Sequence, residues 1–142
     1  MAYADLSGLT KRIGEDVLIE LTDRETPPAG VIDTTVIDAA LADTDALIDG
    51  YLATRYALPL TATSALVTTL AESITIYKLH TFTAPERIEA DYRDALKMLA
   101  SIAKGEVILQ AAGVEPDSSG GSGVQSSDRK PEMRRDNMGS YI

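Results

Sequence analysis

Residues 33–60 read DTTVIDAALADTDALIDGYLATRYALPL, a pattern that predicts one long helix ending before a proline. Asp33 is a good N-cap, and we expect the helix to run from about Thr34 to Tyr56. Leu58-Pro59-Leu60 ends it, because the residue before proline disfavours helical angles. The apolar residues recur at the spacing of one buried face, namely Val36, Ile37, Ala40, Leu41, Leu47, Ile48, Tyr51 and Leu52.

The opposite face of this helix carries three carboxylates, Asp38, Asp45 and Asp49, close together at 100° per residue. Such a group can bind Mg²⁺ or Ca²⁺, but residues 43–50 lack the ligand order of a calcium loop. The preferred interpretation is a solvated acidic face, so we expect no metal and no cofactor. A surface that faces a negatively charged partner without binding it is the other alternative.

Three residues near the predicted end of the helix, Tyr51, Arg55 and Tyr56, are candidates for a protein interface. Tyrosine and arginine are enriched among the residues that dominate binding energy at interfaces. The alternative is that the tyrosines belong to the core and the arginine caps the helix. Gly50 lies inside the helix at a cost of about 1 kcal/mol relative to alanine, and we expect it to allow close packing against a neighbour.

Four further helices are expected. Two are short, Leu6 to Ile13 with Asp5 as its cap and Gly14 as its stop, and Glu15 to Leu21. Two are longer, one from about Ser64 to Thr81 and one that opens with the capping box Thr83-Ala-Pro-Glu86 and runs to Gly105. Residues 107–109 fit either an extended piece or one more helical turn. No segment alternates apolar and polar residues for long, so the sequence predicts an all-α bundle of five helices.

Composition restricts the function further. The chain of 142 residues is the size of one domain, and its 44% hydrophobic content can build a core. It has no Cys, which excludes disulfides and thiolate chemistry, and a single His. It has no long apolar run and no signal peptide, so we expect a cytosolic protein that crosses no membrane. A net charge of −9 argues against wrapping nucleic acid.

The chain changes character near residue 114. Residues 1–114 contain 17 acidic and 9 basic residues, whereas residues 115–142 contain 5 and 4. The stretch Ser118 to Ser127 is rich in Ser and Gly and predicts a flexible linker. The last residues mix apolar and cationic side chains and read as a disordered tail or as a docking segment, whose candidate contacts are Met133, Arg134, Arg135, Met138, Tyr141 and Ile142.

No pattern in the sequence indicates an enzyme. His80 lies near the end of a predicted helix, where a capping or packing role is the simplest interpretation. Gly120, Gly121 and Gly123 lie in the linker and have no strand before them and no helix after them, so they form no phosphate-binding loop. The acids of the last helix have Arg and Lys neighbours at ion-pair spacing. We therefore expect no catalytic residues.

The stretch from Ile19 to Leu60 resembles the phage Mu-like small virion proteins. The resemblance rests on short motifs at fixed spacing, and the most specific string runs from Ile48 to Leu60. It weakens beyond this stretch and covers about residues 1–110. The matching positions are Leu21-Thr22-Asp23, Ile32-Asp33, Val36-Ile37, Ala40-Leu41, Ile48-Asp49, Tyr51-Leu52, Arg55-Tyr56 and Leu58-Pro59-Leu60.

That family is similar in turn to the helical head-to-tail connector, or neck adaptor, proteins of tailed phages. The resemblance implies a ring of copies, commonly twelve, beneath the portal protein, located in the virion neck after assembly in the host cytoplasm. The ring would contact the portal and a tail or tail-terminator protein, and double-stranded DNA would pass through it without specific binding. An acidic wall, for which Asp38, Asp45 and Asp49 are the candidates, would repel that DNA.

Three alternatives to a connector remain. A tail completion or terminator protein is close in function, although such proteins carry more β structure than this sequence predicts. A small acidic helical module that binds a basic protein is the second alternative. A metal-dependent hydrolase that uses the Asp38, Asp45 and Asp49 face is the third.

Overall fold

The computed structural model describes residues 2–60 and 62–109, and this part of the chain contains helices and no strand. Two of the helices are short and three are longer, which confirms the predicted all-α class. The helices are α1 (Leu6–Ile13), α2 (Glu15–Thr22), α3 (Thr34–Leu52), α4 (Ala65–Leu79) and α5 (Glu86–Lys104). Residues 110–142 lie outside the described residues, so the predicted linker and docking tail stay predictions.

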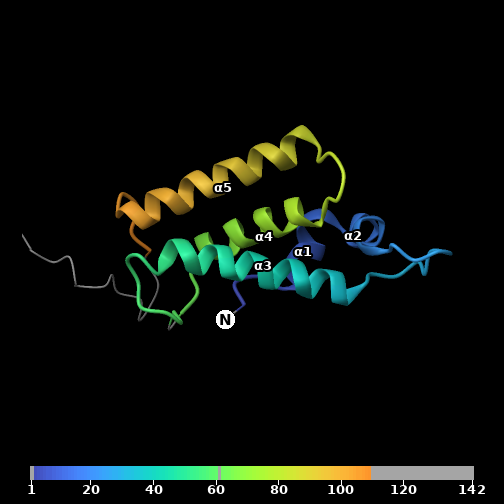
Figure 1. Cartoon of the computed structure of the whole chain (residues 1–142), viewed down its shortest axis with the longest axis horizontal. Helices are drawn as coiled ribbons and strands as arrows, with labels where there is room; N and C mark the ends of the chain where they lie inside the picture. Colours follow the sequence, from blue (N-terminus) through green and yellow to red (C-terminus); the bar gives the residue numbers. More distant parts are fainter. Residues whose placement is uncertain (1, 61, 110–142) are drawn as a thin grey trace, which may run out of the picture.

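The three longer helices form the body of the molecule (Figure 1). α4 packs against both α3 and α5, and α3 also contacts α5. The two short helices lie at the end where α3 begins, with α1 packed on α4 and α2 on α3. The loops before α3 and before α5 project from this same end (Figure 1).

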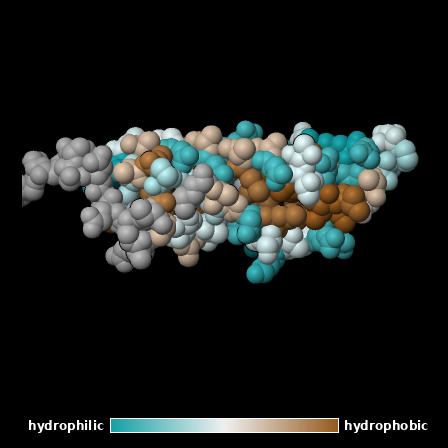
Figure 2. All heavy atoms as spheres, turned by 90° about the horizontal axis from the view of Figure 1, so that it is seen from below, coloured by the Kyte–Doolittle hydropathy of each residue, from teal (hydrophilic) through white to brown (hydrophobic). Residues whose placement is uncertain are grey.

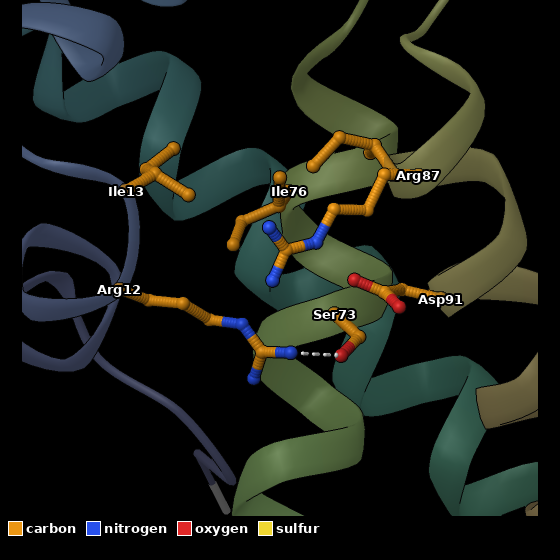
Figure 3. A pocket seen from close by; sticks show the side chains of 7 residues that line it. Arg12, Ile13, Ser73, Ile76, Arg87 and Asp91 are labelled. Carbon is orange, nitrogen blue, oxygen red and sulfur yellow. Dashed lines mark hydrogen bonds between the residues drawn. The ribbon is translucent and has the colours of Figure 1, made fainter.

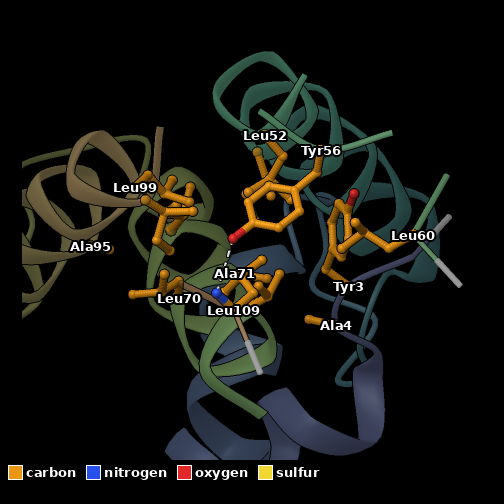
Figure 4. Close-up of a cluster of buried hydrophobic side chains, with 14 residues drawn as sticks. Tyr3, Ala4, Leu52, Tyr56, Leu60, Leu70, Ala71, Ala95, Leu99 and Leu109 are labelled. Carbon is orange, nitrogen blue, oxygen red and sulfur yellow. Dashed lines mark hydrogen bonds between the residues drawn. The ribbon is translucent and has the colours of Figure 1, made fainter. Parts of the chain in front are cut away.

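The buried side chains form two clusters, and nearly all of them are aliphatic. The larger cluster joins the three long helices to the N-terminal segment (Figure 4); it contains Tyr3, Ala4, Ile48, Leu52, Tyr56, Leu60, Val67, Leu70, Ala71, Ile74, Ala95, Leu99, Ile102 and Leu109. The smaller cluster fixes α1 and α2 and contains Leu9, Leu18, Leu21, Ile37, Ala40, Ile76 and Leu79. Each fully buried Leu or Ile contributes about 1.5–3 kcal/mol, so the clusters hold the bundle together.

Helix α3 ends at Leu52, four residues before the predicted end. Residues 53–55 form a turn in which the Tyr56 backbone N–H donates to the Leu52 carbonyl oxygen at 2.8 Å. This turn brings the Tyr56 side chain back into the core, where it is 3% exposed. Burial of an aromatic ring there favours the turn over continued helix.

The start of α5 also differs from the prediction. The expected capping box at Thr83 and Glu86 is wrong, because Pro85 occupies the N-cap position and makes no side-chain cap hydrogen bond. Pro85 has an extended ψ of 147°, so the helix begins only at Glu86. The two other predicted N-caps are confirmed, because the side chains of Asp5 and Asp33 each accept a backbone N–H at the start of their helices. Ser64, which the sequence placed at the start of its helix, caps α4 in the same way.

Gly50 has a different role from the one expected. It is exposed, and a Cβ built at this position would meet nothing within 4 Å. The expected close packing against a neighbour within this chain is therefore wrong. Position 105, in contrast, requires glycine. Its φ of +82° is left-handed, and a Cβ there would lie 2.5 Å from Cζ of Arg55.

Two buried threonines link α3 to α4. Thr44 and Thr75 are both 0% exposed, and the Thr75 hydroxyl lies 2.9 Å from Oγ1 of Thr44. Each Oγ1 also lies within 2.9 Å of the carbonyl oxygen four residues earlier, that of Ala40 or Ala71. A hydroxyl buried without a partner is unfavourable, so these bonds fix how the two helices face each other.

Candidate functional site

The candidate interface at the end of α3 divides into core and surface residues. Tyr56 belongs to the core, and its hydroxyl oxygen accepts the backbone N–H of Leu109 at 3.0 Å (Figure 4). Tyr51 is half-buried against the same cluster. The side chain of Tyr56 is therefore not offered to a partner, and Tyr51 and Arg55 alone remain as candidates for contact.

Arg55 lies over the C-terminal end of α5. Its Cζ would be 2.5 Å from a Cβ at Gly105, so the guanidinium group occupies the space that a side chain there would need. A cation at this end of a helix is favourable because the free carbonyl groups carry partial negative charge. Nε of Arg55 is buried and makes no hydrogen bond within the described part of the chain. The guanidinium group thus covers the C-terminal end of α5.

The three predicted carboxylates of α3 have different environments. Asp38 is exposed, whereas Asp45 and Asp49 are half-buried under the N-terminal segment. The Tyr3 backbone N–H donates to Asp45 at 3.1 Å, and the Tyr3 hydroxyl donates to Asp49. Two of the three acids therefore fasten the chain start to α3, and Asp38 alone is fully free to meet a partner.

This contact shifts the ionisation of its members. Burial raises the pKa of Asp45 above its ordinary value, although the bond from the Tyr3 N–H acts in the opposite direction. Burial also raises the pKa of the Tyr3 phenol, and the bond to the Asp49 carboxylate adds to the rise. The phenol thus stays protonated at neutral pH and remains a donor.

His80 is placed as a packing residue. It forms the C-cap of α4, and its Nδ1 lies 2.8 Å from the carbonyl oxygen of Ile76. Its ring meets Phe82 edge-on at 6.0 Å between centroids. One ring nitrogen is therefore engaged by the backbone of its own helix.

Neither a metal-ligand group nor a membrane helix is found among the described residues. Between residues 2 and 109, residue 61 apart, no three His, Cys, Asp or Glu side chains are grouped so that they would hold a metal ion. No helix of the same part combines the length and apolar character needed to cross a membrane. The candidate tail contacts Met133, Arg134, Arg135, Met138, Tyr141 and Ile142 lie outside the described residues.

A pocket that the sequence did not predict lies between α1, α4 and α5 (Figure 3). Its volume is about 170 Å³, and it combines isoleucines with charged side chains: Arg12, Ile13, Ser73, Ile76, Arg87, Ile88 and Asp91. Arg12 donates to the Ser73 hydroxyl oxygen at 2.8 Å and lies 3.4 Å from the Glu72 carboxylate. Three helices contribute to it, so no single sequence pattern could indicate it.

The sequence of the chain matches a known protein family and two known proteins. The model of the family described as "Bacteriophage Mu, Gp36" matches residues 3–127. The chain is 36% identical over 106 residues to "Gene product J" of Escherichia phage Mu, which covers 75% of this chain and 74% of that protein. It is 32% identical over 107 residues to the "Mu-like prophage FluMu protein gp36" of Haemophilus influenzae, again over 75% and 74% of the two chains.

Proposed function

The chain belongs to the bacteriophage Mu Gp36 family, and from this premise we propose that it is a structural subunit of a head-to-tail connector ring. The ring lies beneath the portal of a tailed phage, extends the DNA channel and gives the tail a surface to bind. The observation that carries the proposal is the all-α body of a chain in this family, since the helical connectors to which the family is similar are built in the same way.

The charge of the body suits a passage for DNA. Residues 1–114 hold 17 acidic and 9 basic residues, so their net charge of −8 repels phosphate groups. A channel has to let DNA slide without local binding minima, and like charge provides this. Sequence-independent DNA binding would instead need clustered Lys and Arg.

The exposed apolar residues suit contacts between subunits. Val31 is 62% exposed and Phe82 is 68% exposed, and their loops lie at the same end of the molecule (Figure 1). Seen from the α3 side, hydrophobic side chains gather over the start of α3 and the neighbouring α2 (Figure 2). Contiguous exposed apolar surface is typical of proteins that work in an assembly.

We propose a role by geometry and not by catalysis. The titratable groups with shifted pKa values serve structure: Tyr3 and Asp45 fasten the N-terminal segment, and Asp23 holds a loop. His80 is bonded to its own helix. Tyr3, Asp45, Asp23 and His80 thus each already have a structural partner.

A tail completion or terminator protein is the second candidate. It shares the expected partners, and it would also lie in the virion. The absence of strands in residues 2–60 and 62–109 favours the connector, because tail terminator and completion proteins carry more β structure. A small acidic module that binds a basic protein is a third, with the free carboxylates of α3 as its surface.

Electron microscopy of phage particles, with the chain tagged, tests the proposal. We expect a ring of the protein, with twelve copies, between the portal and the tail. Purified protein should be monomeric or weakly associated by static light scattering, since cyclic contacts gain strength only when a template closes the ring. A tight closed dimer at micromolar concentration, or absence of the chain from mature particles, would contradict the connector role.

A further inference from the structure

The pocket between α1, α4 and α5 has one guanidinium group without a fixed partner. Arg12 is held by Ser73 and Glu72, as described above. Arg87 is exposed and takes part in neither of the ion pairs found within the described residues, although Asp91 lines the same pocket. Figure 3 shows the Arg87 group extending over the apolar floor beside Ile76. A carboxylate that enters the pocket would meet this group.

The exposed face of α3 has the complementary chemistry. Residues 34–52 contain four Asp and no Lys or Arg. Asp38 and Asp43 are exposed at the two edges of this face. The exposed small residues Ala39, Ala42, Ala46 and Gly50 lie between them, together with Thr35 and the half-buried Asp49. Small side chains let another surface approach the helix backbone closely, and they match an apolar floor flanked by cations.

The two surfaces lie on opposite sides of the molecule. Thr44 and Thr75 mark the side on which α3 and α4 face each other. Two residues along a helix correspond to a rotation of about 200°. Ser73 of the pocket is two residues from Thr75, so it lies on the side of α4 that faces away from this interface. Ala42 and Ala46 are each two residues from Thr44, so they lie on the side of α3 that faces away from it. One copy can therefore offer its pocket to one neighbour and its α3 face to another, which is the arrangement that a cyclic ring requires.

We propose that α3 of one copy docks on the α1–α4–α5 pocket of the next, with Asp38 beside Arg87. The inference rests on the proposed function, because it specifies the contact that repeats around the ring. It puts Asp38 between subunits, whereas the sequence suggested a place on the channel wall. Charge complementarity favours a second copy of this chain as the occupant of the pocket. The pocket presents the guanidinium group of Arg87, and α3 of another copy carries Asp residues and no Lys or Arg.

Disulfide cross-linking of the full chain tests this contact, since the chain has no Cys of its own. We expect a chain carrying both Asp38→Cys and Arg87→Cys to form a ladder of dimers, trimers and larger species under oxidation. Either single variant should give dimers at most, and a mixture of the two single variants should also stop at dimers. The ladder is expected in concentrated protein and in assembled particles, and reduction should abolish it.

A matched control uses Arg93, an exposed arginine of the same helix that is paired with Glu89 and turned about 120° away from Arg87. The pair Asp38→Cys and Arg93→Cys should give no ladder. A ladder of equal yield from this pair, or none from the first pair, would overturn the proposed contact.

Charge reversal gives a second readout that does not depend on cysteine. Arg87→Glu alone and Asp38→Arg alone should each weaken association by roughly tenfold or more, and the two together on one chain should restore it. Melting temperatures of the variants show whether each one folds. Failure of the combined variant to recover, with both single variants folded, would contradict the pairing.

The outcome separates this contact from the connector role. If microscopy shows the ring in particles but the Asp38 and Arg87 cysteines form no ladder there, the contact is wrong and the function stands. If the chain is absent from particles, the proposed function fails, and a ladder in concentrated protein would then describe self-association of another kind.

Discussion

At the residue scale, the buried hydroxyl pair of Thr44 and Thr75 is the least expected feature of the core. Apolar periodicity treats threonine as polar, so both residues would be placed on the surface by pattern alone. Their hydroxyl groups instead bond to each other and to the preceding helical turn. The pair adds directional hydrogen bonds to a core whose other contacts are mostly aliphatic and therefore non-directional.

Thr75→Val is expected to destabilise the protein by about 1 kcal/mol, because it removes one buried hydrogen bond and keeps the shape. The combined change with Thr44→Val should cost less than the sum of the two single changes, since no hydroxyl is then left without its partner. Urea unfolding of the four proteins measures this coupling. Strict additivity would show that the bond between the helices has no energetic effect.

The pH response of Asp45 can be predicted from its surroundings. Burial raises its pKa in the folded chain, so its ionisation opposes folding: the stability linked to this group is full below the ordinary pKa of Asp and is lost as pH rises through the raised folded pKa. Asp45→Asn keeps an oxygen that accepts the Tyr3 N–H. We expect this variant to have a higher Tm than the native chain at pH 7 and the same Tm at pH 3.

Asp23 provides the opposite control. Its two carboxylate oxygens accept the N–H groups of Gly30 at 2.7 Å and Ala29 at 3.1 Å, and these bonds lower its pKa. Its stabilising effect is therefore present above the ordinary pKa of Asp and is lost as pH falls through the lowered one. Asp23→Asn should lower Tm at pH 7, with a difference that shrinks on acidification. Equal pH profiles for the two Asn variants would contradict both assignments.

At the element scale, helix positions could be predicted well because caps and apolar periodicity are local properties. Asp5, Asp33 and Ser64 each mark a helix start that the structure confirms. The end of α3 could not be predicted, because it depends on Tyr56 reaching a core that distant segments build. The pocket of Arg12 and Arg87 was missed for the same reason, since its residues come from three helices.

Replacement by alanine should change the stability in opposite directions at Gly50 of α3 and at Gly105, which ends α5. Gly50→Ala is expected to stabilise the protein by about 0.5–1 kcal/mol, because it is exposed, helical and free of neighbours within 4 Å. Gly105→Ala should destabilise it by about 1 kcal/mol or more, because its φ is +82° and Arg55 fills the space of a Cβ. Thermal unfolding measures both.

Gly50→Ala also bears on assembly. Gly50 lies on the α3 face that we assign to the neighbouring copy. If the Gly50→Ala chain is more stable but forms fewer rings, the loss of rings is due to a disturbed contact between copies and not to misfolding. A variant that lost stability instead would show that α3 carries strain which the open surroundings of Gly50 do not reveal.

At the scale of the whole molecule, the sequence indicated an acidic helical body, and the structure adds how its charge is distributed. Bases appear on α1, α4 and α5, whereas α3 has none. A chain with an acidic helix on one side and the guanidinium group of Arg87 exposed on another is suited to repeat itself around an axis. The same net charge spread evenly would make copies repel one another.

The last prediction concerns the predicted division at residue 114. The Ser- and Gly-rich residues 118–127 have little apolar surface to bury, whereas the two core clusters lie within residues 3–109. Deletion of residues 115–142 is therefore expected to leave the Tm of the body nearly unchanged and to reduce the number of particles with a complete neck, counted by electron microscopy. A matched control reorders residues 118–127 and keeps Met133, Arg134, Arg135, Met138, Tyr141 and Ile142, and it should assemble normally. Complete necks in the deletion variant would show that the docking role of these residues is wrong, and a Tm lowered by many degrees would show that the body extends beyond residue 114.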